Sequence, residues 1–208
     1  MSLADLAISL MEALGGPGIA LVIAAEALFP PVPGEFLLPF AGVTAAATGQ
    51  NVLVPIFWTT LGSVLGGLLV YGAGRALGLR RTRALVARIP LLDAADVDTA
   101  VRFFDRFGFP AVMLARFVPM VRTFISVPAG IERMRVISFV AATGLGSGIW
   151  NAAFVLAGYL FGIAGGEALE SFVRTYSLVL AVVGLLGIAV FARRRLRARR
   201  SVSRDAAG

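Results

Sequence analysis

Four charged residues stand inside apolar, proline-rich stretches of this sequence. Glu26 and Glu35 open and close the stretch EALFPPVPGE, and Arg116 and Arg122 lie in RFVPMVRTFISVPAG. A guanidinium group is a planar, permanently charged fork that suits phosphate, and a carboxyl group whose pKa is raised by burial can take up a proton. We therefore predict an anion site in which the arginines bind a phosphate group and the acids couple or gate through protonation.

A purely structural role for these charges is the alternative. A charge at the centre of a membrane helix costs about 2.5–3.5 kcal/mol, so such residues must be paired or hydrated. Ion pairs between the two stretches would meet that need without a ligand, and a long side chain near the interface could instead reach water. The simplest arrangement is that the two stretches meet, with the acids opposite the arginines.

The composition is that of a membrane protein. Hydrophobic residues make up 58% of the chain and charged residues 15%, against about 45–50% and about 25% in average soluble domains. Cysteine and histidine are absent, which excludes disulfides, thiolate nucleophiles, histidine metal sites and Ser–His–Asp triads. We therefore expect no catalytic residue, no metal and no cofactor, and the chain is not expected to be an enzyme.

Three segments are long and apolar enough to cross a bilayer as helices, which takes about 20 residues each. They are residues 52–73, 137–163 and 176–192. Arginine is the basic residue throughout, and 16 of the 19 lie in segment 75–106, at positions 133 and 135, or in the C-terminal tail. Because short cytoplasmic loops collect basic residues, we predict a multi-pass protein whose first and last spans enter the cytoplasm and whose C-terminus lies there.

Two further apolar regions, about 18–48 and 108–130, are interrupted by prolines and charges. Proline cannot continue a helix interior, and region 108–130 has arginine-rich loops on both sides. We predict that each region is a re-entrant helical hairpin, shielded by protein or lining a wet cavity; for region 18–48, a full span with a cytoplasmic N-terminus is the alternative. The residues expected to break the hairpins are Pro30, Pro33, Pro39, Pro119, Pro128, Gly42 and Gly130.

Two parts of the sequence are similar to each other, which indicates an internal repeat. VPGEFLLPFAG, residues 32–42, is similar to VPMVRTFISVPAG, residues 118–130, and the stretch from Leu61 matches the stretch from Leu145 at 6 of 18 positions. Shared membrane composition is the alternative to a true repeat. If the repeat is real, its copies have opposite orientation, as in many transporters. The predicted fold is an all-α integral membrane protein: an inverted-topology repeat with two opposed re-entrant hairpins and about three full transmembrane helices.

These segments divide the chain into four parts. Residues 1–17 form an N-terminal interfacial segment, 18–165 the core, 166–192 a C-terminal transmembrane helix and 193–208 a basic cytoplasmic tail. Within the core, residues 79–107 are expected to form a cytoplasmic amphipathic helical pair. The glycine pairs Gly62/Gly66, Gly144/Gly148 and Gly158/Gly162 suit close helix packing. The basic tail is typical of a lipid-headgroup anchor, and we expect no nucleic-acid binding.

The two charged stretches resemble motifs of the bacterial DedA family, which shares the VTT, or SNARE-associated Golgi protein, domain. The resemblance covers about residues 17–165, and its more specific part runs from Arg116 to Gly130. It implies opposed re-entrant hairpins in the bacterial cytoplasmic membrane and identifies Glu26, Glu35, Arg116 and Arg122 as the family's essential acids and arginines. One departure is that Glu35 stands where family members carry aspartate, with a shorter gap from the first acid.

What the resemblance implies about function is lipid transport. The expected activity is a flippase or translocase that moves undecaprenyl phosphate or a related anionic phospholipid between leaflets, coupled to a proton or Na⁺ gradient, in support of cell-envelope synthesis. The alternatives are a non-transporting envelope-integrity scaffold and an ion-coupled exporter of small cations or drugs. The partners are therefore an anionic lipid, membrane lipids and a coupling ion. The oligomeric state is left open, with a homodimer as one alternative.

Overall fold

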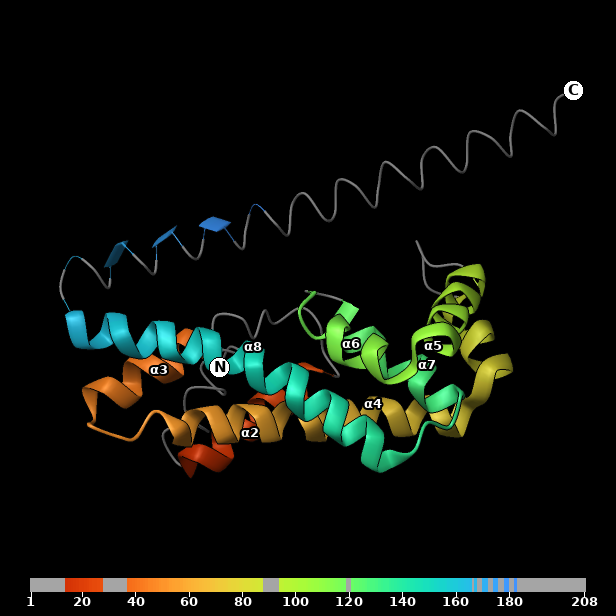
Figure 1. Cartoon of the computed structure of the whole chain (residues 1–208), viewed down its shortest axis with the longest axis horizontal. Coiled ribbons are helices and arrows are strands. Elements are labelled where there is room, and N and C mark those ends of the chain that lie inside the picture. Colours follow the sequence, from red (N-terminus) through yellow and green to blue (C-terminus); the bar gives the residue numbers. More distant parts are fainter. Residues whose placement is uncertain are drawn as a thin grey trace, which may run out of the picture. The chain divides into compact units, whose positions relative to one another are not determined.

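A computed structural model describes residues 14–27, 37–87, 94–118 and 121–165, with isolated residues between 167 and 182. The chain divides into two units, 1–163 and 164–208, and the first carries the elements discussed below. In the described ranges every regular element is an α-helix (Figure 1). The helices are α2 (Gly16–Glu26), α3 (Leu37–Ala47), α4 (Leu53–Val86), α5 (Ala94–Ala115), α6 (Val121–Phe124), α7 (Ser126–Ile131) and α8 (Val136–Ala164).

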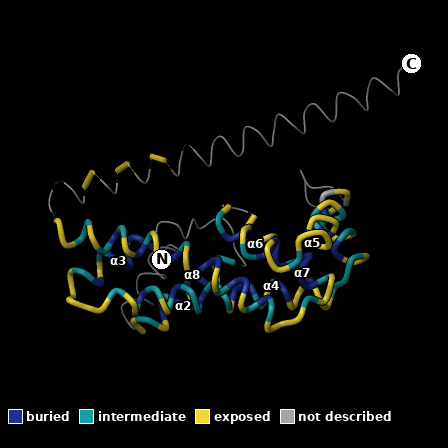
Figure 2. Tube along the Cα trace, in the orientation of Figure 1, coloured by how far each residue is buried: buried dark blue, intermediate teal, exposed yellow. Residues whose placement is uncertain are grey.

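Two of these helices, α4 and α8, are long and apolar enough to cross a membrane. Only 28% and 39% of their most apolar windows are buried inside the protein, so most of this apolar surface faces outward, as a lipid-facing helix requires. Buried residues recur along α4 at three- and four-residue spacing, from Pro55 and Thr59 to Gly62 and Gly66, and form one inward-facing side (Figure 2). An all-α membrane fold is confirmed; the third predicted span, 176–192, lies largely outside the described residues.

Helices α4 and α8 pack against each other in opposite directions. A methyl group built at Gly148 would contact Thr60, one at Gly144 would contact Val64, and one at Gly67 would contact Thr143. Residue numbers therefore increase along α8 as those of the facing residues in α4 decrease, which means that the two helices are antiparallel (Figure 1). At Gly144 and Gly148 an added methyl group would make only ordinary contact, whereas at Gly158 it would overlap the carbonyl oxygen of Pro39 and at Gly162 it would lie 3.0 Å from Ala46, both in α3. The predicted close packing is therefore confirmed at the Gly158/Gly162 pair.

The shorter helices pack on α4 and α8 through backbone contacts at glycine. A methyl group at Gly62 would lie 2.5 Å from the carbonyl oxygen of Ala20 in α2, and one at Gly146 would lie 2.5 Å from that of Met113 in α5. Thus α4 packs on α2 and α8 packs on α5, in each case the helix that begins the same half of the chain. The two glycines at these contacts are 84 positions apart. Replacing either glycine would force the two helices apart.

A second pair of crossings connects the two halves of the chain. A methyl group at Gly42 in α3 would overlap the carbonyl oxygen of Val155 in α8, and one at Gly130 in α7 would overlap that of Tyr71 in α4. Gly130 follows Gly42 by 88 residues and Val155 follows Tyr71 by 84, the two offsets of the internal resemblance. Each long helix therefore packs on the broken segment of the other half.

These crossings give a stability prediction. Gly42→Ala and Gly130→Ala should each lower the melting temperature in detergent, because the added methyl group overlaps backbone that cannot rotate away, an overpacking cost of about 1–3 kcal/mol or more. Gly72→Ala is the matched control: the residue lies in α4 with nothing within 4 Å of the added carbon, and alanine favours a helix by about 1 kcal/mol over glycine. A melting temperature unchanged in the first two variants would contradict the close crossings.

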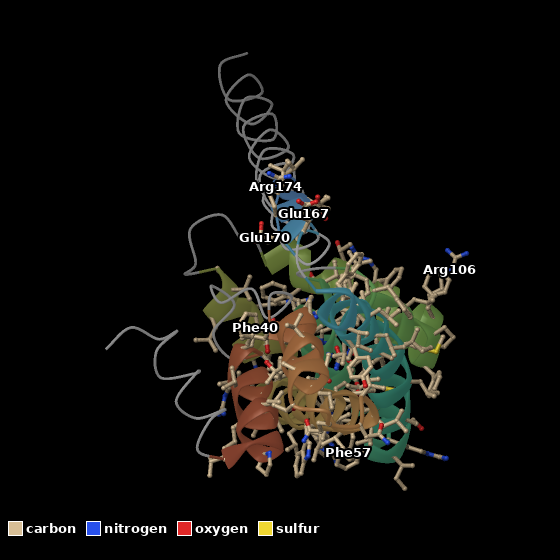
Figure 3. The ribbon with its side chains drawn as sticks, turned by 90° about the vertical axis from the view of Figure 1, so that its left-hand side faces the viewer. Phe40, Phe57, Arg106, Glu167, Glu170 and Arg174 are labelled. Atoms are coloured by element: carbon tan, nitrogen blue, oxygen red, sulfur yellow. The ribbon has the colours of Figure 1, made fainter. Side chains whose placement is uncertain are left out.

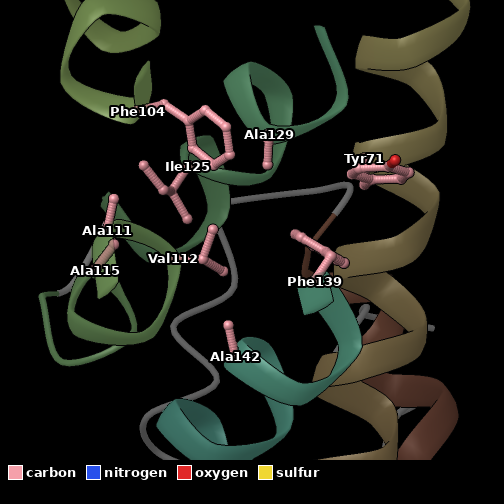
Figure 4. Close-up of a cluster of buried hydrophobic side chains, with 9 residues drawn as sticks. All are labelled: Tyr71, Phe104, Ala111, Val112, Ala115, Ile125, Ala129, Phe139 and Ala142. Carbon is pink, nitrogen blue, oxygen red and sulfur yellow. The ribbon is translucent and has the colours of Figure 1, made fainter. Parts of the chain in front are cut away.

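The main hydrophobic cluster forms where the second broken segment meets α4 and α8 (Figure 4). Tyr71 and Phe139 stack with ring centroids 4.8 Å apart, and the Tyr71 hydroxyl donates a 2.5 Å hydrogen bond to the Met134 carbonyl. Small side chains fill the space around these rings. The cluster comprises Tyr71, Phe104, Ala111, Val112, Ala115, Ile125, Ala129, Phe139 and Ala142. It fixes the helices that carry the arginines.

Glycines at two points turn the chain out of the bundle. Gly78 interrupts α4 with φ 65° and Gly108 interrupts α5 with φ 50°, a left-handed conformation that glycine adopts without steric cost. Between them, the described residues 79–87 and 94–107 form two short helical arms joined by an ion pair in which Arg83 donates to Asp98. The helical pair predicted for 79–107 is thus confirmed in its described part, and its cytoplasmic location stays a prediction.

The predicted hairpin breaks need correction at three positions. Pro39 and Gly42 lie inside α3, and Gly130 lies inside α7. Pro39 lies near the start of the described part of α3, and the two glycines allow close packing instead of a bend. Pro128 also lies in α7. Because proline has no N–H, it cannot donate a helical hydrogen bond to the carbonyl of Phe124, and α6 ends at that residue, as expected of a break. Pro30, Pro33 and Pro119 lie outside the described residues.

Candidate functional site

One acid and one arginine from the two charged stretches meet. The Nη2 group of Arg122 donates to Oε1 of Glu26 at 2.5 Å. Glu26 is the last residue of α2 and Arg122 the second of α6, 96 positions later. Their side chains are 11% and 16% exposed. The predicted contact between the two stretches is therefore present for this pair, while the roles of both residues in function stay predictions.

Arg116 is held differently. The residue is 5% exposed, and its Nη2 group donates to the hydroxyl oxygens of Ser126, at 3.1 Å, and Thr143, at 3.0 Å. Its guanidinium carbon lies 5.9 Å from the centre of the Phe139 ring. Its Nε atom is buried and has no hydrogen-bond partner among the described residues. Within that part of the chain, no carboxylate is hydrogen-bonded to this permanently charged group.

A glycine leaves room for this arginine. A methyl group at Gly67 in α4 would stand 3.0 Å from Nη2 of Arg116 and 3.6 Å from the Thr143 methyl group. Helices α4, α7 and α8 thus surround the guanidinium group with a glycine, a serine and a threonine. Uncharged hydroxyl oxygens satisfy part of its hydrogen-bonding capacity but do not neutralise its charge, and a buried charge without a counter-ion is costly. An anionic ligand would remove that cost.

Sequence reasoning missed Ser126, Thr143 and Gly67 as parts of the site. A signal for Thr143 does exist, because Thr143, Ser147 and Asn151 follow each other at four-residue spacing on α8, so they share one face of the helix. All three are buried. Ser126 and Gly67 carry no comparable local signal, since their proximity to Arg116 depends on how α4 and α7 cross α8.

The same polar spacing occurs on α4, with Thr59 and Ser63 lying 84 positions before Thr143 and Ser147. Asn151 donates to the Ser63 hydroxyl at 3.3 Å, which connects the two long helices. Thr59 is fully buried and donates to the carbonyl oxygen of Pro55 in its own helix at 2.8 Å. Thr59 and Thr143 are thus separated by the 84-residue offset of the internal resemblance, and Thr143 is the one that contacts an arginine.

The remaining predicted site residue, Glu35, lies outside the described residues. In the described ranges no group of three or more acidic, histidine or cysteine side chains is placed to hold a metal ion. The site as described therefore consists of one acid–arginine pair and one arginine with hydroxyl partners.

Comparison with known proteins identifies the family. Residues 17–160 match the VTT domain. The chain belongs to the VTT-domain family, the DedA family. The resemblance seen in the two charged motifs is thereby confirmed, and the family region contains Glu26, Arg116 and Arg122.

Several relatives of this family align over most of the chain. An "Alkaline phosphatase-like protein" of Lactococcus lactis subsp. cremoris is 34% identical over 92% of both chains. "Undecaprenyl phosphate transporter A" of Staphylococcus aureus is 30% identical over 90% of this chain and 94% of the relative, and the protein of that name from Bacillus subtilis is 28% identical over 86% and 87%. No solved structure matches this chain.

Proposed function

We propose that this membrane protein translocates an anionic lipid, undecaprenyl phosphate or a related phospholipid, across the cytoplasmic membrane. The observation that carries the proposal is the state of Arg116: a charged group, 5% exposed, with hydroxyl partners, a buried Nε without a hydrogen-bond partner and no bonded carboxylate among the described residues. A phosphate headgroup would supply a counter-charge that none of the described residues provides through a hydrogen bond. Arginine suits this task because its fork can donate two hydrogen bonds to one phosphate.

The Glu26–Arg122 ion pair suggests how binding and proton uptake could be coupled. A phosphate that approaches Arg116 would compete with Glu26 for the guanidinium group of Arg122. If Arg122 turns to the phosphate, Glu26 loses this ion pair in a poorly hydrated site, where a carboxylate without a positively charged partner is costly. Uptake of one proton by Glu26, with Glu35 as a second acid, would then accompany lipid binding, and release of the lipid would restore the ion pair and return the proton.

Alternating access would follow from an inverted-topology repeat. The antiparallel packing of α4 and α8 and the matching crossings of Gly42 with Val155 and of Gly130 with Tyr71 support two copies of opposite orientation. Transporters with such repeats move one copy against the other around a central site. In this proposal the two broken segments are re-entrant hairpins, the chain is multi-pass with a cytoplasmic C-terminus, and the acyl chain stays in lipid while the headgroup crosses between the halves.

The names of two relatives agree with this proposal, because both are called undecaprenyl phosphate transporters. Another relative is named for its likeness to alkaline phosphatase, which would place this chain among hydrolases. A transporter remains the better proposal here, since the chain lacks both histidine and cysteine and the buried arginines need no nucleophile to bind phosphate.

The test is a leaflet assay with purified protein in proteoliposomes that contain a fluorescent polyprenyl phosphate. Lipid movement by the protein alone, faster than in empty liposomes and inhibited by excess unlabelled undecaprenyl phosphate, would support the proposal. A folded protein that moves no phosphate lipid but restores envelope integrity in cells would instead indicate a scaffold. Transport of small cations that survives replacement of both arginines would indicate an ion-coupled exporter.

A further inference from the structure

The first half of α5, residues 94–107, has an aromatic side that faces away from the protein. Phe103 and Phe107 are 49% and 45% exposed, and their ring centroids lie 4.9 Å apart. Another side of the same helix is apolar and buried: Val97, Val101 and Phe104 are at most 9% exposed. This helix therefore has two apolar sides, and the protein covers one of them.

Two acidic side chains of the same helix, Asp98 and Asp105, interact with other parts of the protein. Asp98 is paired with Arg83 of α4, whose Nε donates to it at 2.7 Å. Asp105 lies beside Glu132, in the loop between α7 and α8: burial, followed by the charge and hydrogen bonding of Asp105, raises the pKa of the Glu132 carboxyl group. Asp98 and Asp105 are thus engaged with other parts of the protein.

Arginines stand next to the exposed aromatic side. Arg102 and Arg106 are exposed, and the guanidinium carbon of Arg106 lies 5.4 Å from the centre of the Phe107 ring. Arg106 projects away from the ribbon into its surroundings (Figure 3). On the neighbouring arm of α4, Arg80 and Arg81 are exposed as well. The exposed residues of this helical pair thus include two aromatic rings and four arginines.

The two glycine breaks hold this surface near the membrane. Gly78 connects one arm to the apolar part of α4, and Gly108 connects the other to the end of α5, where Ala111 and Val112 are buried in the main cluster. Each arm therefore begins one residue from an apolar helical segment, which keeps that end of the arm close to the predicted membrane surface. A helix with aromatic and basic side chains at this depth is suited to lie in the plane of a lipid surface.

We propose that Phe103 and Phe107 dock the first half of α5 on the surface of the membrane, and that Arg102 and Arg106 bind the anionic headgroups of that leaflet. The rings enter the boundary between headgroups and acyl chains, and the arginine side chains extend along it to reach phosphate groups. The occupant of this surface is a lipid layer rather than a protein, because positively charged residues border the rings while Asp98 and Asp105 interact with Arg83 and Glu132. The docking holds the arm that leads into the Arg116 region at a fixed depth, and it does not depend on the proposed transport activity.

The absence of native cysteine allows a direct test. Phe103→Cys, labelled with an environment-sensitive fluorophore, is reconstituted in liposomes of phosphatidylcholine with and without phosphatidylglycerol. Asp105→Cys is the matched control, because two residues turn the side chain by about 200° around the helix. With anionic lipid, the probe at 103 should be quenched by a spin label on the acyl chains and protected from aqueous iodide, and the probe at 105 should show the reverse.

The charge requirement is tested by adding Arg102→Gln and Arg106→Gln to the labelled Phe103→Cys protein. In anionic liposomes the ratio of docked to undocked probe should fall about 30-fold, which corresponds to about 1 kcal/mol for each arginine near an anionic surface. Equal accessibility of the probes at 103 and 105 to iodide would overturn the proposal. So would a probe at 103 that is protected from iodide but not reached by the lipid quencher, since that result would mean that protein covers the aromatic side.

Discussion

Arg122→Gln protein is expected to fold but to lose phosphate-lipid translocation almost completely. The substitution removes one partner of the ion pair with Glu26, whose side chain is 11% exposed, and it removes a charged donor for the phosphate. A hydrogen bond to a charged group contributes about 1.5–3 kcal/mol, which corresponds to a loss on the order of 10- to 100-fold in transport rate. The measurement is the initial rate of lipid movement in proteoliposomes, with melting temperature as the check on folding.

The double variant Glu26→Gln/Arg122→Gln separates a functional role from a structural one. Removing a single partner leaves a poorly hydrated charge and should lower the melting temperature, whereas removing both charges should restore much of the stability. If the pair serves transport, the double variant regains stability but stays inactive. If the pair only holds the two segments together, the double variant should regain activity along with stability, and the proposed role of Arg122 would be wrong.

Arg116→Lys is the second substitution with a large expected effect. Lysine keeps the positive charge but replaces the planar fork by a single ammonium group, which cannot reproduce the hydrogen bonds to Ser126 and Thr143 while presenting further donors to a ligand. We expect a loss of translocation on the order of 10- to 100-fold, as for one or two charge-assisted hydrogen bonds. A lysine variant with full translocation would show that a positive charge at position 116 is sufficient and that the guanidinium fork is not needed.

A hydroxyl series tests whether the position of Arg116 matters. Thr143→Val preserves shape but removes the acceptor 3.0 Å from Nη2 of Arg116, so translocation should fall about 10-fold or more, and Thr143→Ser should retain most of it. Thr59→Val is the matched control, because Thr59 lies 84 positions before Thr143, is equally buried and donates to a carbonyl of its own helix. Equal losses in the two valine variants would indicate a general packing effect rather than positioning of the arginine.

These expectations rest on an asymmetry within a repeated framework. The two halves share the crossings at Gly42 and Gly130 and the threonine positions 59 and 143, yet the arginines belong to the second half and Glu26 to the first. The ion pair and the Arg116 contacts therefore join elements from both halves. A relative movement of the halves would change the contacts of these charged groups, which is what coupling between binding and conformation requires.

Much of this organisation was predictable from local patterns. Long apolar segments predicted α4 and α8, since helices satisfy their own backbone groups in lipid. Glycine spacing predicted close packing, which occurs where α4 meets α2 and where α8 meets α3. The helical pair at residues 79–107, between the breaks at Gly78 and Gly108, was also predictable in outline, because this segment is rich in charged residues whereas the segments on either side are apolar. The assignment of Pro39, Gly42 and Gly130 as breaks was wrong, because all three lie within described helices and glycine in a membrane helix often serves a crossing.

The sequence by itself determined the class of protein, the presence of buried charges and the chemistry available to them, because these properties follow from residue types and their spacing along one segment. Only the tertiary structure decided that Arg122 pairs with Glu26 and that Arg116 is held by Ser126 and Thr143 beside Gly67. The reason is physical: these partners are far apart in the chain, and they meet because backbone contacts at glycine set how the helices cross. No local pattern encodes those crossing geometries.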